Sequence, residues 1–163
     1  ICKQRKSVKS IIPTLEKKRS IAKEAQTATI YEGMNGIKTA FDDILNRLTT
    51  KESYYCFTLG DERREERWIR FFDNFHAKTQ KMQIYPKLLS YEGNKSKLGI
   101  FWKRRYMKVR YIDFQLPTGI FIYKETVLTT TPGAKPTAFV IRSKSHYERY
   151  KKFFEEMWKR AKK

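Results

Sequence analysis

The chain has 163 residues, of which 40% are hydrophobic and 15% are aromatic, so it can bury one packed core and is not of the disordered class. Its 36 Lys and Arg against 17 Asp and Glu give a formal net charge of +19, which favours nucleic acids or anionic small molecules as partners. No apolar run is long enough to cross a bilayer, and none follows the basic start of the chain as it would in a signal peptide.

The cysteines and histidines are too few to suggest a disulfide framework or a metal site. Cys2 and Cys56 are isolated thiols in a chain without a visible export signal, which indicates a reducing cytoplasm. No CxxC pattern occurs and the only histidines are His76 and His146, so we expect neither zinc nor another cofactor. Because the first residue is Ile rather than Met, we expect the chain to be part of a longer protein.

Residues 1–25 are predicted to form a helix that precedes the main domain at 26–163. Ile1, Val8 and Leu15 are seven residues apart, which indicates a coiled-coil seam, and Pro13 predicts a kink. A charged amphipathic helix has little core of its own, so we expect it to pack on a second chain or to link to a further domain. The dimerisation residues that we expect on its apolar edge are Val8, Ile12 and Leu15.

The chain between residues 27 and 112 alternates between predicted strands and helices. Apolar residues at three- and four-residue steps predict helices that start near Ile37 and Asp61, and a third, basic helix is expected over 95–106. Runs rich in β-branched and aromatic residues predict strands at 27–32, 53–59, 83–90 and 107–112. Such alternation is typical of parallel strands joined by helices that cover the sheet.

In residues 117–163 the predicted strands follow one another without a helix between them. Three further strands are expected at 120–123, 126–131 and 137–142, and the last two form a hairpin around the turn at 132–135. Ser145 and Glu148 match the capping box of a final helix. The predicted fold class is therefore α/β, with a mostly parallel mixed sheet, helices on both faces and a leading linker helix.

Five short strings, in this order, resemble the C-terminal effector-binding domain of TrmB-type archaeal transcription regulators, which has a phospholipase D-like fold. The leading helix, with Pro13-Thr14-Leu15, resembles the helical linker of the same family. The five strings are Ile30-Tyr31-Glu32-Gly33 followed by Gly36-Ile37-Lys38, Phe71-Phe72-Asp73-Asn74-Phe75-His76-Ala77-Lys78, Val109-Arg110-Tyr111-Ile112, Gly119-Ile120-Phe121-Ile122-Tyr123-Lys124, and Phe153-Phe154-Glu155-Glu156-Met157-Trp158-Lys159.

The resemblance implies a role in transcription regulation. It implies a winged-helix DNA-binding domain upstream of the chain, a homodimer joined partly through the linker helix, and a sugar or sugar-like effector. The charge of +19 departs from a sensor of neutral sugars and shifts the expected effector toward an anion. We therefore expect an effector-sensing and dimerisation domain, and a basic protein that contacts DNA or RNA directly is the alternative.

The sequence predicts no catalysis. The related phospholipase D enzymes need a His-x-Lys pair and a downstream Asp, since the His attacks phosphorus and the Lys steadies the phosphoryl charge. His76-Ala77-Lys78 matches half of this pattern, but it lies on a predicted helix and no Asp follows at the required spacing. By topology the motif would fall on the strand around Tyr123, where no His occurs, and His146 fits the first turn of the last helix.

A ligand is expected beyond the carboxyl ends of the strands, as in other parallel α/β sheets. Gly33 and Gly60 let the backbone approach a ligand closely, but they are equally well explained as turn residues. Arg110 is either a ligand contact, a solvated side chain or the partner of Asp113. The full set of expected ligand-binding residues is Glu32, Gly33, Asn35, Gly60, Asp61, Arg110, Tyr111 and Tyr123.

The densest basic and aromatic patch is Lys103-Arg104-Arg105, flanked by Trp102 and Tyr106. Such a patch can bind phosphates through its charge while an aromatic ring stacks on a base. The other interpretation is a solvated helix face whose aromatic residues pack inward. These three basic residues are the candidates for the nucleic-acid alternative.

Overall fold

The computed structural model describes residues 26–58, 65–95 and 106–163. The predicted helix at 1–25, with the dimerisation residues Val8, Ile12 and Leu15, lies outside the described residues. The described chain forms seven strands, three α-helices and one 3-10 helix. In chain order they are β1 (Thr27–Glu32), α2 (Gly33–Arg47), β2 (Tyr55–Thr58), α3 (Glu66–Lys81), β3 (Lys87–Tyr91), η2 (Glu92–Asn94), β4 (Lys108–Ile112), β5 (Gly119–Tyr123), β6 (Thr126–Thr131), β7 (Thr137–Arg142) and α5 (Lys144–Arg160).

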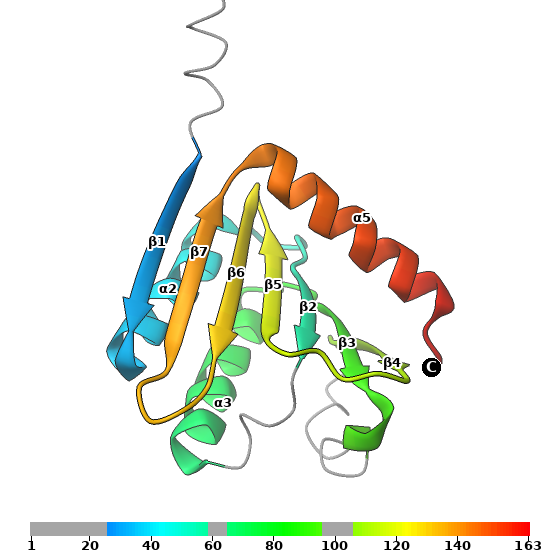
Figure 1. Ribbon diagram of the computed structural model, residues 1–163, viewed down its shortest axis with the longest axis horizontal. Helices are drawn as coiled ribbons and strands as arrows, with labels where there is room; N and C mark the ends of the chain where they lie inside the picture. Colours follow the sequence, from blue (N-terminus) through cyan, green and yellow to red (C-terminus); the bar gives the residue numbers. More distant parts are fainter. Residues whose placement is uncertain (1–25, 59–64, 96–105) are drawn as a thin grey trace, which may run out of the picture.

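All seven strands belong to one sheet with the order β1-β7-β6-β5-β2-β3-β4 (Figure 1). Only β2–β3 and β3–β4 pair in parallel, and the other four pairs are antiparallel. The expectation of a mostly parallel sheet is therefore wrong, although the sheet is mixed as predicted. Short turns join β5 to β6 and β6 to β7, and a turn of a few residues can join only antiparallel neighbours; the second of these is the hairpin expected from the sequence. The pairs β1–β7 and β2–β5 join strands that are distant in the sequence, and they are antiparallel as well.

The strand directions bring many strand ends to one edge of the sheet. The pairings make β1, β2, β3, β4 and β6 run in the same direction, while β5 and β7 run in the opposite direction. The edge where the first five strands end is called the carboxyl edge below. Helix α2 also begins there, directly after β1.

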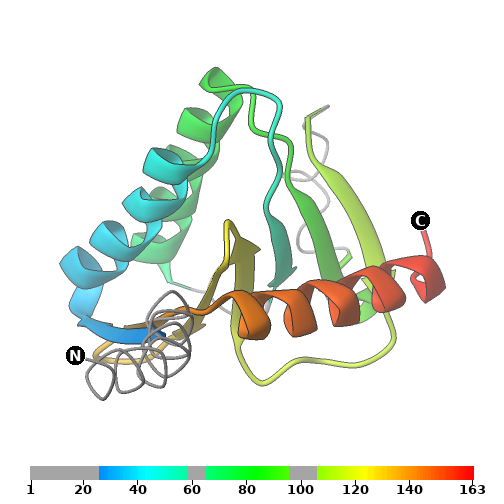
Figure 2. The same ribbon diagram turned by 90° about the horizontal axis from the view of Figure 1, so that it is seen from above.

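The helices lie on both faces of the sheet, as expected. Helices α2 and α3 cover one face, and α5 runs across the other face from β6 toward β4 (Figures 1 and 2). The sheet therefore has a separate core on each side.

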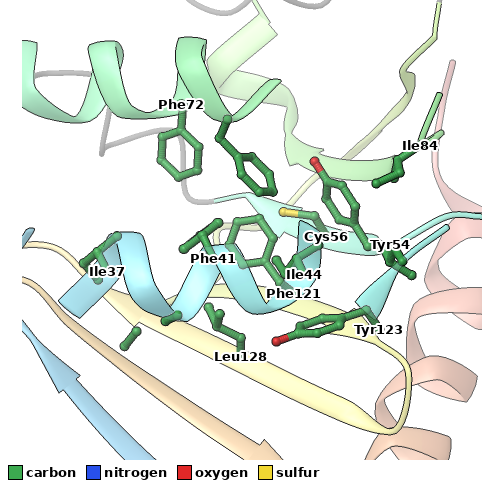
Figure 3. Close-up of a cluster of buried hydrophobic side chains, with 14 of the residues drawn as sticks. Ile37, Phe41, Ile44, Tyr54, Cys56, Phe72, Ile84, Phe121, Tyr123 and Leu128 are labelled. Carbon is green, nitrogen blue, oxygen red and sulfur yellow. The ribbon is translucent and has the colours of Figure 1, made fainter. Parts of the chain in front are cut away.

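Phe41 on α2 is at the centre of the first core (Figure 3). Its ring makes edge-on contacts with three rings of α3, at centroid distances of 5.0 Å for Phe71, 5.7 Å for Phe72 and 5.1 Å for Phe75. Phe121 on β5 completes the set at 4.7 Å. Edge-to-face contacts are the preferred geometry of aromatic pairs, so this cluster fixes both helices on the sheet.

The second core lies under α5, and Phe154 is its central residue with 1% of its surface exposed. Its ring lies 5.1 Å from the rings of both Tyr55 and Phe57 on β2. Trp158, one helical turn later, stacks at 5.6 Å. The last helix is therefore held to the sheet by aromatic residues at a four-residue step.

Candidate functional site

The structure separates the predicted ligand-binding residues into three groups. Glu32 is the last residue of β1, whereas Arg110 and Tyr111 are on β4 at the opposite side of the sheet. Six strand spacings of about 4.8 Å separate β1 from β4, or roughly 29 Å. These residues cannot line one small-molecule pocket. Gly60 and Asp61 lie outside the described residues, as do Lys103, Arg104 and Arg105.

The residues at the end of β1 have partners within the chain. The carboxylate of Glu32 lies 2.7 Å from the ammonium group of Lys135, and the backbone N–H of Gly33 donates to the carbonyl of Pro136 at 2.7 Å. Gly33 has a φ of +72°, which favours glycine, and the carbonyl of Asn35 accepts from the Thr39 hydroxyl at 3.0 Å. These contacts explain Gly33 as the residue that turns the chain from β1 into α2.

Tyr123 lies at the edge opposite to the carboxyl edge, because β5 runs against β2. Its hydroxyl donates to the carboxylate of Asp43 on α2 at 2.8 Å, and Arg142 donates to the same carboxylate at 2.9 Å. Burial, together with the Asp43 carboxylate, raises the pKa of Tyr123 well above its ordinary value. Tyr123 therefore ties α2 to the sheet, away from the strand ends where a ligand is expected.

Arg110 has a contact that sequence reasoning did not consider. Its guanidinium group lies 4.8 Å from the ring centroid of Trp158, and its Nη1 donates to the carbonyl of Trp158 at 2.5 Å. Stacking on an indole ring combined with a hydrogen bond fixes a planar guanidinium group well. Arg110 thus holds the end of α5 on β4 and is not paired with Asp113.

Tyr111 is the predicted residue that lines a hollow at the carboxyl edge. The hollow has a volume of about 270 Å³ and lies between the ends of β3, β4 and α5. Its lining residues are Glu92, Tyr111, Ile112, Asp113, Phe114, Met157, Arg160, Ala161 and Lys162. Two backbone hydrogen bonds between Tyr111 and Lys162, at 2.8 and 3.0 Å, close its side by fastening the residues after α5 to β4.

The hollow combines charged, aromatic and aliphatic groups. Lys162 and Glu92 form an ion pair at 3.2 Å, whereas Arg160 and Asp113 are exposed and form no ion pair with any residue that the structure describes. Phe114 is 41% exposed, which is unusual for a phenylalanine. Arginine binds phosphate or carboxylate groups through paired N–H donors, and a carboxylate accepts hydrogen bonds from hydroxyl groups.

Two further observations describe the surroundings of the Tyr111 side chain. Burial raises the pKa of its phenol, and the ammonium group of Lys95 lies 4.8 Å from the centroid of its ring. Tyr111 is the one predicted ligand-binding residue among those that line the hollow, and the prediction from the sequence did not include the other lining residues. The sequence does indicate one of these residues, because Asp113 directly follows a strand end, where ligands bind in such sheets. The lining residues from α5 could not be predicted, because their position depends on how the helix packs on the sheet.

Both histidines lie on helices, whereas the His-x-Lys motif of an enzyme with this topology would lie on a strand. His76 is on α3 with 5% of its surface exposed, and its ring packs 5.9 Å from Phe72 and 5.7 Å from Phe75. His146 is on α5, with its ring 4.8 Å from that of Tyr150. The sequence contains only these two histidines, so no strand carries a His-x-Lys pair.

Among residues 26–58, 65–95 and 106–163, no group of three or more His, Cys, Asp or Glu side chains could hold a metal ion. None of the helices formed by those residues has the length and apolar character that crossing a membrane requires.

Comparison with known proteins identifies the fold. No family model matches the sequence, and no curated protein sequence matches it significantly. TrmBL2, described as an archaeal chromatin protein with a novel mode of DNA binding, matches with a TM-score of 0.58 and 13% identity over 98% of this chain and 66% of its own. NucT from Helicobacter pylori has a TM-score of 0.60 and 10% identity over 84% of this chain and 98% of its own. The phospholipase D family member Nuc from Salmonella typhimurium has a TM-score of 0.53 and 10% identity over 85% and 97%. The chain has a phospholipase D-like fold.

This result confirms the fold expected from the short sequence strings. Both a TrmB-type protein and phospholipase D family members occur among the similar structures. The phospholipase D-like chain spans about two thirds of the length of TrmBL2, since it covers 66% of that protein.

Proposed function

We propose that this chain is the non-catalytic, effector-sensing and dimerisation domain of a TrmB-like transcription regulator that acts in the cytoplasm. The observation that carries the proposal is the hollow at the end of β4, where Arg160 and Asp113 have no ion-pair partner among the described residues. DNA binding would come from a winged-helix domain upstream of the chain. The structural similarity to TrmBL2 over 98% of the chain supports this arrangement.

The positions of the two histidines support the proposed absence of catalysis. Phosphodiester cleavage in the phospholipase D superfamily uses a histidine nucleophile, which a buried aromatic environment would disable. His76 is enclosed by Phe72 and Phe75, and His146 is on the outer helix. Neither histidine lies on a strand, which supports the proposed absence of catalysis.

The effector that fits the hollow best is a small anionic sugar-like compound, such as a sugar phosphate or a sugar acid. Arg160 would bind the phosphate or carboxylate group, and Asp113 would accept hydrogen bonds from hydroxyl groups. Phe114 offers an exposed ring against which a sugar ring can pack. The formal charge of +19 raises the local concentration of anions over neutral sugars.

A thermal-shift screen followed by titration calorimetry tests the proposal. We expect at least one sugar phosphate or sugar acid to raise the melting temperature, and its neutral sugar to have a smaller effect. Arg160→Gln should weaken binding about 10- to 100-fold, because a charged hydrogen bond contributes about 1.5–3 kcal/mol. Lys159→Gln is the matched control, since it removes the same charge from a neighbouring residue that does not line the hollow. A screen without any shift, or equal losses in the two variants, would contradict the proposal.

Direct nucleic-acid binding by this chain is the second candidate, and the net charge of +19 favours it. It predicts binding of random duplex DNA whose affinity falls steeply with salt concentration, and weaker binding after Lys103, Arg104 and Arg105 are replaced by Gln. Filter binding from about 50 to 200 mM salt separates the two functions. No retention at the lowest salt concentration would exclude this candidate.

A further inference from the structure

One part of the sheet surface is left uncovered by the helices. Figures 1 and 2 show α5 running across the sheet away from β1, so none of the helices that the structure describes covers the face of β1 and β7 on that side. On β1, Tyr31 packs into the first core, and strand alternation therefore turns Ile30 to the uncovered side. Ile30 is 62% exposed, and its cross-strand partner Phe139 is 38% exposed.

The uncovered surface, called the β1–β7 face, consists of Ala28, Ile30, Phe139 and Ile141. These residues are neighbours across one antiparallel pair, since Ile30 is opposite Phe139 and Ala28 is opposite Ile141. Two large apolar side chains exposed next to each other indicate an interaction surface more strongly than single exposed residues do.

The charge distribution limits the kind of partner. Strands β1 and β6 contain no Lys or Arg, and the one basic residue of β7, Arg142, donates to Asp43 of α2 on the other face, although these residue types make up 36 of the 163 positions of the chain. Such a surface cannot bind nucleic acid or an acidic peptide through charge. A second copy of this chain also carries +19, so the two molecules repel each other least where few basic residues lie at the contact; Lys135, at the end of this surface, is already paired with Glu32.

We propose that the β1–β7 face packs against the same face of a second copy of this chain. Two sheets packed face to face lie about 10 Å apart, which suits interdigitation of Ile30 and Phe139 with their counterparts. The contact is closed by a two-fold axis, as is usual for homodimers. The identity of the partner rests on the homodimer included in the proposed function.

The direction of the axis follows from what precedes β1. The sequence predicts dimerisation residues at Val8, Ile12 and Leu15, in the helix expected before this strand. A two-fold axis parallel to β1 lets both chains enter β1 from the same end, so the two seams can pair in parallel. Edge-to-edge pairing of the two β1 strands would place these segments at opposite ends and is therefore disfavoured.

Sedimentation equilibrium of the complete chain tests this interface. We expect the wild type to dimerise and Ile30→Glu to raise the dimer dissociation constant at least about tenfold, because a charge would be buried in an apolar contact. Ala28→Glu should have the same effect. Tyr85→Glu is the matched control, since Tyr85 is 39% exposed but lies outside the β1–β7 face. Circular dichroism of each variant should match the wild type, because the replaced side chains are exposed.

The outcomes separate this interface from the proposed function. Equal dissociation constants for Ile30→Glu, Ala28→Glu and Tyr85→Glu would overturn the interface. If Leu15→Glu alone then broke the dimer, the homodimer would remain and only the β1–β7 face would be excluded. A monomeric wild type would overturn both the interface and the homodimer, whereas effector binding is measured independently by thermal shift.

Discussion

Glu52 joins two connections of the chain through its carboxylate. One oxygen accepts a hydrogen bond from the ammonium group of Lys124 in the β5–β6 turn, and the other accepts from the backbone N–H of Thr49 at 2.7 Å. The Lys124 hydrogen bond, followed by that of Thr49, lowers the pKa of Glu52 from 4.5 to about 2. The folded state therefore favours the ionised carboxylate.

This contact makes the stability of the protein depend on pH in a defined window. Because the pKa is lowered on folding, Glu52 stabilises the folded state above pH 4.5 and loses this effect as the pH falls toward 2. Glu52→Gln should therefore reduce the loss of stability between these pH values, measured by urea unfolding. Glu148→Gln is the control, since that exposed carboxylate forms no ion pair with a described residue. Identical acid profiles for the wild type and Glu52→Gln would contradict the assignment.

Single residues show where sequence reasoning reached its limit. Tyr111 was expected at a strand end and lines the hollow there, because its position depends only on where β4 stops. Arg110 was expected to be solvated, to contact a ligand or to pair with Asp113, but it stacks on Trp158. That contact depends on how α5 crosses the sheet, which no spacing within β4 can indicate.

At the scale of elements, the start of α5 differs from the expected capping box. The helix begins at Lys144, and the side chain of Ser143 accepts a hydrogen bond from the backbone N–H of His146 at 3.3 Å. The predicted cap at Ser145 lies two residues too late. Three serine and lysine residues precede His146 in close succession, so the sequence pattern alone could not choose among the possible starts.

Replacing the two serines separates these alternatives. Ser143→Ala should lower the free energy of unfolding by about 1 kcal/mol, as is typical for the loss of an N-cap. Ser145→Ala should change it by less than about 0.5 kcal/mol, because Ser145 is exposed. Urea unfolding at neutral pH measures both values, and a larger loss for Ser145→Ala would restore the capping box inferred from the sequence.

The pairing of strands was harder to predict than their existence. Every described strand overlaps a segment that the composition marks as β-rich. The alternation with helices is present from β1 to β3 in the described part of the chain, and β2, β3 and β4 are indeed parallel. The hairpin predicted for the last two strands is confirmed as β6 and β7. The antiparallel pairs that were not predicted are β5–β6, which a short turn joins, and β1–β7 and β2–β5, whose strands are distant in the sequence.

At the scale of the whole molecule, the excess of positive charge opposes folding. Most ion pairs among the described residues are exposed and contribute little, so repulsion between the remaining Lys and Arg residues should dominate. Salt screens this repulsion over a distance of about 10 Å at 0.1 M. We therefore expect the melting temperature to rise between about 20 and 300 mM NaCl.

A triple variant provides the control for this effect. Lys144, Lys152 and Lys159 are exposed on α5 and form no ion pair with a described residue. Their replacement by Gln should raise the melting temperature at low salt and weaken its dependence on salt, measured by differential scanning calorimetry. A melting temperature that falls as salt is added would show that attractive ion pairs dominate instead.

The position of α5 after all seven described strands also governs the order in which these elements can fold during synthesis. Every strand that α5 covers is synthesised before the helix itself. The second core therefore stays open to solvent until Phe154 and Trp158 have been added. Likewise, β1 has no neighbouring strand in the sheet until β7 has been synthesised. A nascent chain on the ribosome therefore exposes the apolar side of β2 and β5 until α5 has been synthesised. During this interval the chain is most prone to aggregate and most dependent on chaperones.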